Sequence, residues 1–525
     1  MNMDHPYIDT VIYDNFYEML RGRYDESADT CAIRFMKGDK IIDITYHEMI
    51  DQIASVYGFL KNEGYKGRHI GIVSENRYEY LIIYLASVFD NVIVPIDKEL
   101  DRQTVADCVR RFDVDALFFT DKTSDTISHI SEDVKLYNID ASYTGIAVGY
   151  ETASFFEDVK DTDKDRFAIL ASTSGTDGKM KGVMLSQYNV ITNIRGTLEN
   201  NVLKNPTLAF LPMNHTYGFN PCMLATLYNG TTLCLCLELK HLLRDFKSFD
   251  PFFFGAVPMV IEGMYSNILR EIRLRKKERV FRSMLYVSRI LLKAGIDLRH
   301  FFFGKMINKN LRLVVNGGAA LNSEYVEKFS ELGITILNGY GLTECSPTIA
   351  VSRECNNVAG SAGTIMKNID VKISDEGEIM VKGPCVMLGY YNDEKATQQC
   401  MKDGYFCTGD IGYTEGRVIY VTGRKKNLII LENGKNVAPE YLEDKINRID
   451  YVKESLVVEK KTEKGNSILT ALVVLSENVS EETIKQDIDK INETLPGYMH
   501  IDDYKIMSKE FEKNSSRKII RSLYV

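Results

Sequence analysis

Residues 168–186 read AILASTSGTDGKMKGVMLS, and the rest of the chain is interpreted outward from this stretch. Ile169 and Leu170 are typical of the end of a buried strand, 172–178 is rich in hydroxyls and glycine, and 182–185 predict a return strand. Glycines let a backbone approach a ligand, while amides, hydroxyls and the side chains of Lys179 and Lys181 suit phosphate oxygens. No Gly-Lys-Ser/Thr opens a helix here, so this is not a Walker loop. The stretch alone fits either a polyphosphate site or a surface hairpin.

The length, composition and net charge of the chain limit the class of protein. A chain of 525 residues exceeds one ordinary core, so we expect roughly two or three domains. With 45% hydrophobic and 26% charged residues the chain is typical of a soluble globular protein, and a net charge of −9 argues against a nucleic-acid binder. The ten cysteines lack metal-ligand spacing and are expected as small buried side chains. No apolar run is long enough to span a membrane and MNMDHPYIDT has no leader character, so we expect a cytoplasmic protein.

Strand and helix patterns alternate over much of the chain. Thr45 and Glu48 predict a capping box at a helix start. Strand-like runs at 69–73, 91–95 and 116–120 are separated by helix-like runs at 78–89 and 100–112, and the alternation resumes over 188–237. This rhythm predicts parallel sheets with helices on their faces.

A basic segment lies at 262–312. Thirteen lysines or arginines fall between Arg270 and Arg312, interleaved with apolar residues at the spacing of an amphipathic helix. We favour a helix packed on the core with solvated cations. The alternative is a peripheral contact with an anionic membrane surface.

Two later strand ends suit a nucleotide. The run LVVNGGAAL at 313–321 ends a buried strand in small residues, so that a flat ligand could lie against Gly317, Gly318 and Ala319. The run NGYGLTE at 338–344 offers an aromatic face at Tyr340, a hydroxyl at Thr343, and a carboxylate for Mg²⁺ at Glu344.

These motifs together resemble the adenylate-forming superfamily, which includes acyl-CoA synthetases, luciferases and adenylation domains. Its signature Thr-Ser-Gly-Thr-Thr-Gly-x-Pro-Lys-Gly stands here as TSGTDGKMKG at 173–182, with Asp177 and Met180 departing from it. Further similar motifs are YGLTE at 340–344, DGYFCTGD at 403–410, GRKKN at 423–427, NGKNV at 433–437 and KNSSRKIIR at 513–521, the last with Arg517 in place of glycine. The resemblance runs from about Tyr46 to Arg521 and is closest to long-chain fatty acyl-CoA synthetases.

The resemblance implies an α/β fold: a large N-terminal domain (1–424) of parallel and mixed sheets with flanking helices, and a small mobile α+β C-terminal domain (425–525) with a hinge at Lys426. It implies binding of ATP or AMP by Thr173, Ser174, Gly175, Thr176, Gly178, Lys181, Gly317, Gly318, Ala319, Asn338, Gly339, Tyr340, Gly341, Thr343, Asp410, Arg424 and Lys518. Catalytic roles fall to Lys518, Glu344, Thr343 and Lys181, and Mg²⁺ would be held at Glu344 and Thr173. His215, Tyr217, Gly218, Gly317 and Gly341 would line an acyl pocket, and Gly434 and Lys435 would meet coenzyme A or phosphopantetheine.

The implied activity is ATP-dependent activation of a medium- or long-chain fatty acid to acyl-AMP and then to acyl-CoA. One alternative is transfer of the acyl group to the phosphopantetheine thiol of an acyl carrier protein. Amino-acid or aryl-acid adenylation is a further alternative, but 215–224 (HTYGFNPCML) contains no acidic residue to hold an α-amine. The remaining alternative is an inactive lipid or nucleotide sensor, for which Asp177, Met180 and Arg517 are the only support.

Overall fold

The computed structural model describes residues 6–146, 149–174, 180–431, 435–461, 467–513 and 519–524. The chain divides into two compact units. The larger comprises Met1–Asp370 with Val381–Phe406, and the smaller comprises Val371–Met380 with Cys407–Val525. The family-derived boundary between 424 and 425 stays a prediction.

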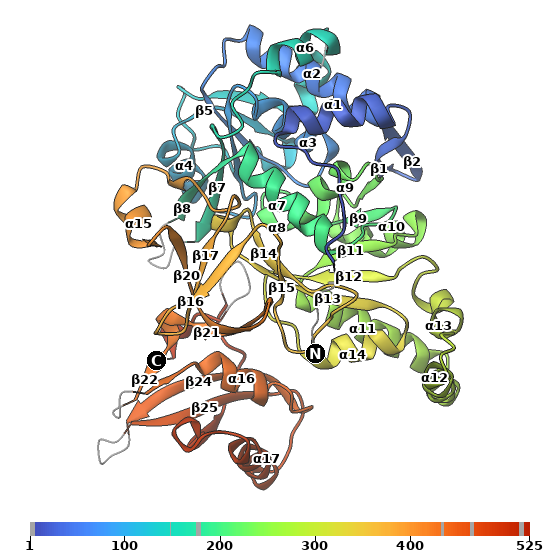
Figure 1. Ribbon diagram of the computed structural model, residues 1–525, viewed down its shortest axis with the longest axis vertical. Helices are drawn as coiled ribbons and strands as arrows, with labels where there is room; N and C mark the ends of the chain where they lie inside the picture. The colour runs from blue at the N-terminus through green and yellow to red at the C-terminus, as the bar shows by residue number, and fades with distance from the viewer. Residues whose placement is uncertain are drawn as a thin grey trace. The chain divides into compact units, whose positions relative to one another are not determined.

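The larger unit contains two sheets with helices around them (Figure 1). One sheet has the spatial order β18 (Gly389–Tyr390), β8 (Met180–Ser186), β7 (Phe167–Ser174), β4 (Val92–Ile96), β3 (His69–Val73), β5 (Val114–Phe119) and β6 (Lys135–Asn138). The strands from β7 to β6 are parallel, and β8 returns antiparallel to β7. The alternation of strand and helix patterns therefore correctly predicted the parallel strands β3, β4 and β5 of this sheet.

The second sheet of this unit has a parallel centre. Its order is β15 (Gly363–Ile365), β14 (Thr348–Val351), β13 (Thr335–Gly341), β12 (Leu313–Asn316), β11 (Phe253–Ala256), β9 (Thr207–Ala209), β10 (Leu233–Leu235), β1 (Cys31–Lys37) and β2 (Lys40–Thr45). The strands from β13 to β1 pair in parallel, whereas β14, β15 and β2 add antiparallel pairs. The carboxyl ends of β11, β12 and β13 thus open at one edge, where ligands bind in such sheets.

The helices of this unit include α1 (Phe16–Ser27), α2 (Tyr46–Asn62), α3 (Tyr78–Ser87), α4 (Arg102–Arg111), α5 (Ile139–Ile146), α6 (Thr152–Val159), α7 (Gln187–Asn200), α9 (Ala225–Tyr228), α10 (Leu242–Phe249), α14 (Ser323–Glu331) and α15 (Glu394–Gln399). Of these, α2, α3, α4, α7 and α9 match predicted helical runs, and the others were not predicted individually. The predicted capping box at the start of α2 is present, with Thr45 and Glu48 each bonding the other's backbone amide.

The basic segment 262–312 forms three helices rather than the single helix its spacing suggested. They are α11 (Pro258–Leu274), α12 (Glu278–Lys293) and α13 (Arg299–Ile307), gathered beside α14 (Figure 1). The breaks fall at Lys276 and Gly295, whose φ angles are +53° and +80°. Left-handed backbone cannot continue a right-handed helix, which is why the periodic pattern does not survive as one element. No helix in the described ranges has the length and apolarity needed to cross a membrane.

Helix α7 is joined to the second sheet by asparagine side chains. Asn193 Nδ2 donates to the carbonyls of Cys345 (2.9 Å) and Thr348 (2.7 Å), while its Oδ1 accepts from the Thr348 amide. Asn200 Nδ2 donates to the carbonyls of Val351 (3.1 Å) on β14 and Thr364 (3.2 Å) on β15. Asn193 therefore satisfies backbone groups of the turn that follows β13, and Asn200 satisfies carbonyls of the next two strands.

The smaller unit has its own core. β24 (Val452–Lys461), β25 (Ser467–Leu475) and β26 (Asp503–Ile506) form one sheet, with α16 (Pro439–Ile446) and α17 (Glu481–Glu493) as its main helices. β20 (Tyr405–Glu415) and β21 (Val418–Arg424) form an antiparallel pair, and β22 (Ile429–Ile430) pairs with β23 (Asn436–Val437). Buried aliphatic residues of β24, β25, α16 and α17 make up the core.

Candidate active site

The organising stretch is an antiparallel pair of strands. Thr173 on β7 lies opposite Lys181 on β8, so the two are register partners on adjacent strands. The predicted phosphate contacts of Gly175, Thr176 and Gly178 lie outside the described residues. Met180, which stands where the family has proline, packs against a core cluster with its sulfur 3.4 Å from that of Cys108. Packing against this cluster therefore explains why methionine is accommodated at this position.

Lys181 and Glu344 come together around one aromatic ring. The hydroxyl of Tyr390 donates to Oε1 of Glu344 at 2.9 Å, and Lys181 Nζ lies 4.8 Å from the centroid of the same ring. Burial and the neighbouring Glu344 carboxylate raise the pKa of Tyr390, which therefore stays protonated as a donor. Among the described residues, no carboxylate lies within ion-pair distance of Lys181.

The Thr343–Glu344 turn is anchored to its neighbours. It forms a short 3₁₀ helix (Thr343–Cys345) that ends at Ser346 with a φ of +68°. The Glu344 carbonyl accepts from the amide of Met387 at 2.8 Å, in the segment that leads into β18. The hydroxyls of Thr343 and Thr216 lie 3.4 Å apart. The turn therefore lies beside Thr216, which stands between His215 and Tyr217 of the predicted acyl pocket.

His215 stands at the edge of this region. Its side chain is 56% exposed, and its Nε2 lies 3.9 Å from Oδ2 of Asp97, the residue directly after β4. The segment before it is held by Asn76, whose side chain bonds the carbonyl of Leu211 (2.9 Å) and the amide of Met213 (3.1 Å). His215 is thus set between the two sheets of the larger unit.

Tyr217 and the neighbouring glycines pack against one another. The Tyr217 hydroxyl donates to the carbonyl of Val315 at 2.8 Å, and burial raises its pKa well above 10. A Cβ on Gly317 would collide with this ring, and one on Gly341 would collide with the carbonyl of Pro347. Both glycines are therefore required by internal packing. Gly318 is exposed and has a φ of +80°, which favours glycine for its backbone alone.

The remaining predicted nucleotide contacts in this unit lie at the ends of β12 and β13. Asn338 accepts a bond from Asn316 Nδ2 at 3.2 Å and donates to the carbonyl of Ser361 at 3.2 Å. Tyr340 and Gly339 occupy β13 and are partly exposed, and Ala319 is exposed just beyond β12. These residues therefore lie at the same edge of the sheet, where the parallel strands β12 and β13 end.

In the smaller unit, Asp410 and Arg424 face each other across β20 and β21. They are register partners, and Arg424 Nε lies 2.7 Å from Oδ1 of Asp410, a carboxylate that is almost fully buried. Lys426 is exposed in the 3₁₀ turn Lys425–Asn427. Lys435 is exposed, with Nζ 4.3 Å from the ring centroid of Tyr498. Gly434 and Lys518 lie outside the described residues, but Arg521, three positions after Lys518, is paired with Glu443.

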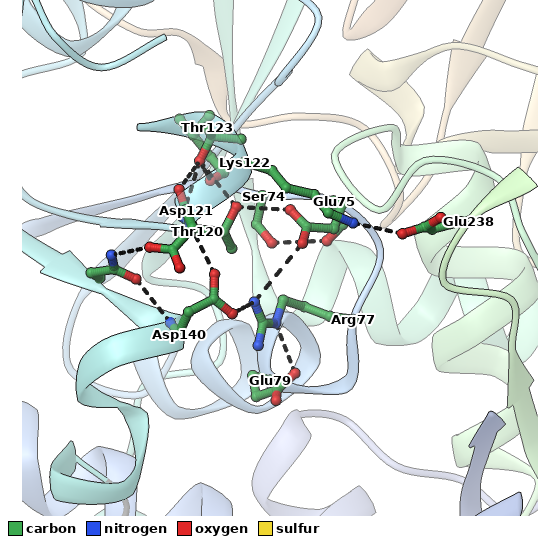
Figure 2. Close-up of polar contacts among 12 residues, drawn as sticks. Ser74, Glu75, Arg77, Glu79, Thr120, Asp121, Lys122, Thr123, Asp140 and Glu238 are labelled. Atoms are coloured by element: carbon green, nitrogen blue, oxygen red, sulfur yellow. Dashed lines mark hydrogen bonds and ion pairs between the residues drawn. The ribbon is translucent and has the colours of Figure 1, made fainter. Parts of the chain in front are cut away.

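A second polar cluster, the Arg77 network, lies after β3, β5 and β6 (Figure 2). The side chain of Arg77 is 15% exposed and lies 2.8 Å from both Glu79 and Asp140, with Glu75 at 4.0 Å. The Thr120 hydroxyl donates to Glu75, and the Asp121 amide donates to Asp140. Lys122 donates to Glu238, which is the last member of the network. Lys122, followed by Lys240, lowers the pKa of Glu238 to about 2. The network is satisfied internally and connects loops at strand ends.

The residues around Tyr390 fit a magnesium nucleotide. Mg²⁺ is usually held by one or two carboxylates together with phosphate oxygens and water. Glu344 supplies one carboxylate, whose Oε2 makes no hydrogen bond to any described residue, and Thr343 adds a hydroxyl beside it. The ammonium of Lys181 is not neutralised by a described carboxylate, so it keeps charge for a phosphate chain.

Sequence reasoning missed Tyr390 and Asp97. Tyr390 lies 46 positions from Glu344, and nothing in GYYNDE distinguishes it from the adjacent Tyr391. Asp97 follows a strand end, which was a usable signal, but His215, the residue it faces, follows a strand of the other sheet. In both cases the pairing depends on how distant strands meet.

Comparison with known proteins places the chain among enzymes. The model described as AMP-binding enzyme matches residues 23–391, and that described as AMP-binding enzyme C-terminal domain matches 426–525. Long-chain-fatty-acid–CoA ligase FadD15 of Mycobacterium bovis is 29% identical over 458 residues, which cover 79% of this chain and 75% of the relative. Long-chain-fatty-acid–[acyl-carrier-protein] ligase AEE15 of Arabidopsis thaliana is 27% identical over 402 residues, covering 63% and 54%.

A solved structure extends the likeness to the fold. ATP-bound MatB from Rhodopseudomonas palustris superposes with a TM-score of 0.80 over 98% of both chains, at 21% identity. The predicted α/β fold with a smaller C-terminal domain is therefore confirmed.

Proposed function

The chain belongs to the family of AMP-binding enzymes, and on that premise we propose that it activates a medium- or long-chain fatty acid with ATP and transfers the acyl group to coenzyme A. The observation that carries the proposal is the arrangement of Lys181, Glu344 and Tyr390. A cation that pairs with no described carboxylate and a carboxylate both contact one ring. The relatives named as long-chain fatty-acid ligases support the choice of acid.

The chemistry sets what the chain must supply. A carboxylate does not acylate a thiol directly, because oxide would have to leave. In the proposed first step the acid's oxygen attacks the α-phosphorus of ATP, the bond to the β-phosphate oxygen breaks, and pyrophosphate leaves. In the second step the thiol loses its proton, attacks the acyl carbon, and AMP leaves. Neither step requires a nucleophile from the protein, so positioning and charge stabilisation dominate.

The proposed roles follow from position. Lys181 would meet the β- and γ-phosphates with Thr173 opposite it, and Lys518 would bridge the acyl carboxylate and the α-phosphate. Glu344 and Thr343 would hold Mg²⁺, which neutralises phosphate charge when bound. Tyr340 would stack on adenine and the glycine-rich strand ends would border the nucleotide. Asp410 and Arg424 would contact the ribose. Because the two side chains form an ion pair, each would have to hydrogen-bond the sugar while it stays paired with the other.

The acyl pocket is assigned to the region of His215, Tyr217, Gly218, Gly317 and Gly341. The buried bond of Tyr217 fixes its ring, which packs directly against Gly317. An ammonium group entering this region would need a buried partner, and burying an unpaired charge is costly. The proximity of Asp97 to His215 supplies a carboxylate that favours the second candidate, an amino-acid adenylating enzyme.

Release of pyrophosphate from ATP, measured with decanoate, palmitate, an aryl acid and leucine, tests the proposal. We expect the fatty acids to drive release. Comparable turnover with leucine would favour the amino-acid candidate, and no release with any acid would favour the inactive sensor. Product formation with coenzyme A and, separately, with a phosphopantetheinylated carrier protein distinguishes the two acceptors, for which Lys435 and Gly434 are proposed contacts.

A peripheral membrane contact is the alternative to the favoured packed helix, and the exposed residues of one helix make it testable. Helix α12 exposes Val280, Tyr286, Val287 and Ile290 by 44–66%, although Phe281 packs inward. The cations among them are Arg279, Arg282, Arg289 and Lys293. Exposed apolar residues beside cations suit an anionic lipid surface. Sedimentation with anionic vesicles at low salt, and release at high salt, is expected; equal recovery with neutral vesicles would leave α12 as an ordinary solvated helix.

A further inference from the structure

The groups proposed to handle the phosphates come from separate elements. Lys181 is on β8, and Glu344 follows β13 in the other sheet. Flexible charged side chains in such positions would each have to be ordered before they could act, at an entropic cost. Tyr390 contacts both of them, through its hydroxyl and through its ring.

Tyr390 is itself held firmly. It is 8% exposed, and its strand β18 pairs with β8 so that Tyr390 lies opposite Val183, two residues from Lys181. Its amide donates to Thr397 Oγ1 at 2.8 Å, and the next amide donates to the carbonyl of Gly182 at 2.8 Å. The ring is therefore fixed relative to the strand that carries the lysine.

The two contacts act differently on the two charges. The hydroxyl bond occupies Oε1 of Glu344 and orients the carboxylate while leaving its charge in place. The ring attracts the Lys181 ammonium through its quadrupole and, unlike a carboxylate, does not neutralise it. Resting on the function proposed above, we propose that Tyr390 is a positioning residue that presents Lys181 to the phosphate chain and Glu344 to the metal.

Three variants separate these contacts. Tyr390→Phe removes the hydroxyl bond and keeps the ring, whereas Tyr390→Leu removes both. Tyr391→Phe is the matched control, because the Tyr391 hydroxyl donates to Asp113 at 2.7 Å, away from Lys181 and Glu344. Each variant is first compared with the wild type by thermal unfolding, so that loss of structure is recognised.

The principal readout is the affinity for ATP, measured by calorimetry without and with Mg²⁺ and in the absence of any acid. We expect Tyr390→Phe to reduce the magnesium-dependent gain in affinity by about tenfold, as for loss of a bond to a charged group. Its affinity for metal-free ATP should stay near that of the wild type. Tyr390→Leu should also lower the affinity for metal-free ATP, because Lys181 no longer contacts an aromatic ring. Tyr391→Phe should match the wild type in both measurements.

The outcomes of this inference and of the proposed function are distinguishable. If Tyr390→Phe and Tyr391→Phe show the same magnesium dependence, the positioning role is wrong even though fatty acids drive pyrophosphate release. If the wild type binds magnesium-ATP and the Tyr390 variants lose that coupling, the role stands even where no acid is turned over. Failure of the wild type to bind magnesium-ATP would overturn both.

Discussion

The Arg77 network and the Tyr390 site are both polar clusters near strand ends of the larger unit, and they treat charge in opposite ways. In the network, Arg77 faces Glu79 and Asp140 at 2.8 Å (Figure 2). In the Tyr390 site, Lys181 and Glu344 meet on a tyrosine instead of on each other. Charges compensated within the chain stabilise the fold, whereas a charge kept without a described counterion is available to a ligand.

The largest effect is expected outside both clusters, at Lys518. If this lysine adds the charge needed at the α-phosphate, Lys518→Ala should abolish formation of acyl-AMP while still converting supplied acyl-AMP and coenzyme A to thioester. Lys426→Pro, which fixes φ at the proposed hinge, should do the reverse if it traps the adenylating pose. Pyrophosphate release from ATP measures the first half-reaction of each variant, and thioester yield from synthetic acyl-AMP measures the second. Loss of both half-reactions in a folded Lys518→Ala protein would contradict this division.

Glu344→Gln tests the Tyr390 site directly. It preserves shape and removes a charge at the proposed metal, so pyrophosphate release should slow by about a hundredfold or more and require more Mg²⁺. Glu79→Gln in the Arg77 network removes the same charge from an internal pair and should leave the magnesium titration unchanged. Indistinguishable titrations for the two variants would mean that Glu344 is structural.

Arg77→Met tests how much the cation of the network contributes to stability. It leaves three carboxylates without their shared cation, in a cluster only partly open to water, and should lower the free energy of unfolding by about 2 kcal/mol. Urea unfolding measures this loss. Affinity for ATP should be unaffected, and a selective loss of ATP binding at unchanged stability would place Arg77 in the site.

Asp140 gives the network a pH dependence. Burial alone would raise its pKa, but bonds from Arg77 and the Asp121 amide outweigh this, so the pKa lies below 3.8. A lowered carboxyl pKa adds stability above the unfolded value and loses it as pH falls through the folded value. Asp140→Asn should therefore lower the melting temperature at pH 7, and the difference should shrink below about pH 4. A difference that persists in acid would exclude this origin.

The smallest effect is expected at Lys122. Its pair with Glu238 has a distance of 2.6 Å but side chains that are 60% and 32% exposed. Exposed pairs contribute roughly 0.2–1 kcal/mol and are screened by salt. Lys122→Gln should therefore change stability by less than about 1 kcal/mol, and the change should disappear in about 0.5 M salt. A larger, salt-insensitive loss would indicate that this link between the sheets carries more of the fold.

Local pattern was sufficient to predict much of the fold and insufficient for the site. The strand at 69–73 and the cap at Thr45 depend on neighbouring residues, and both were predicted correctly. The break at Lys276 was missed because a left-handed lysine gives no compositional sign. Tyr390 was missed because its partners are set by long-range strand pairing. Residues such as Gly317 and Gly341 were associated with a ligand, yet internal packing already requires them to be glycine.

The asparagines of α7 constrain how such a chain can diverge. Asn193 offers two N–H donors to carbonyl oxygens and one acceptor to an amide, all without charge. Aspartate would turn an oxygen toward two carbonyls, and leucine would leave three backbone groups unsatisfied. Stepwise replacement at this position is therefore blocked unless the 345–348 turn changes at the same time. Evolution can remodel the turn and the helix only as a pair, and lineages that alter one should carry a compensating change in the other.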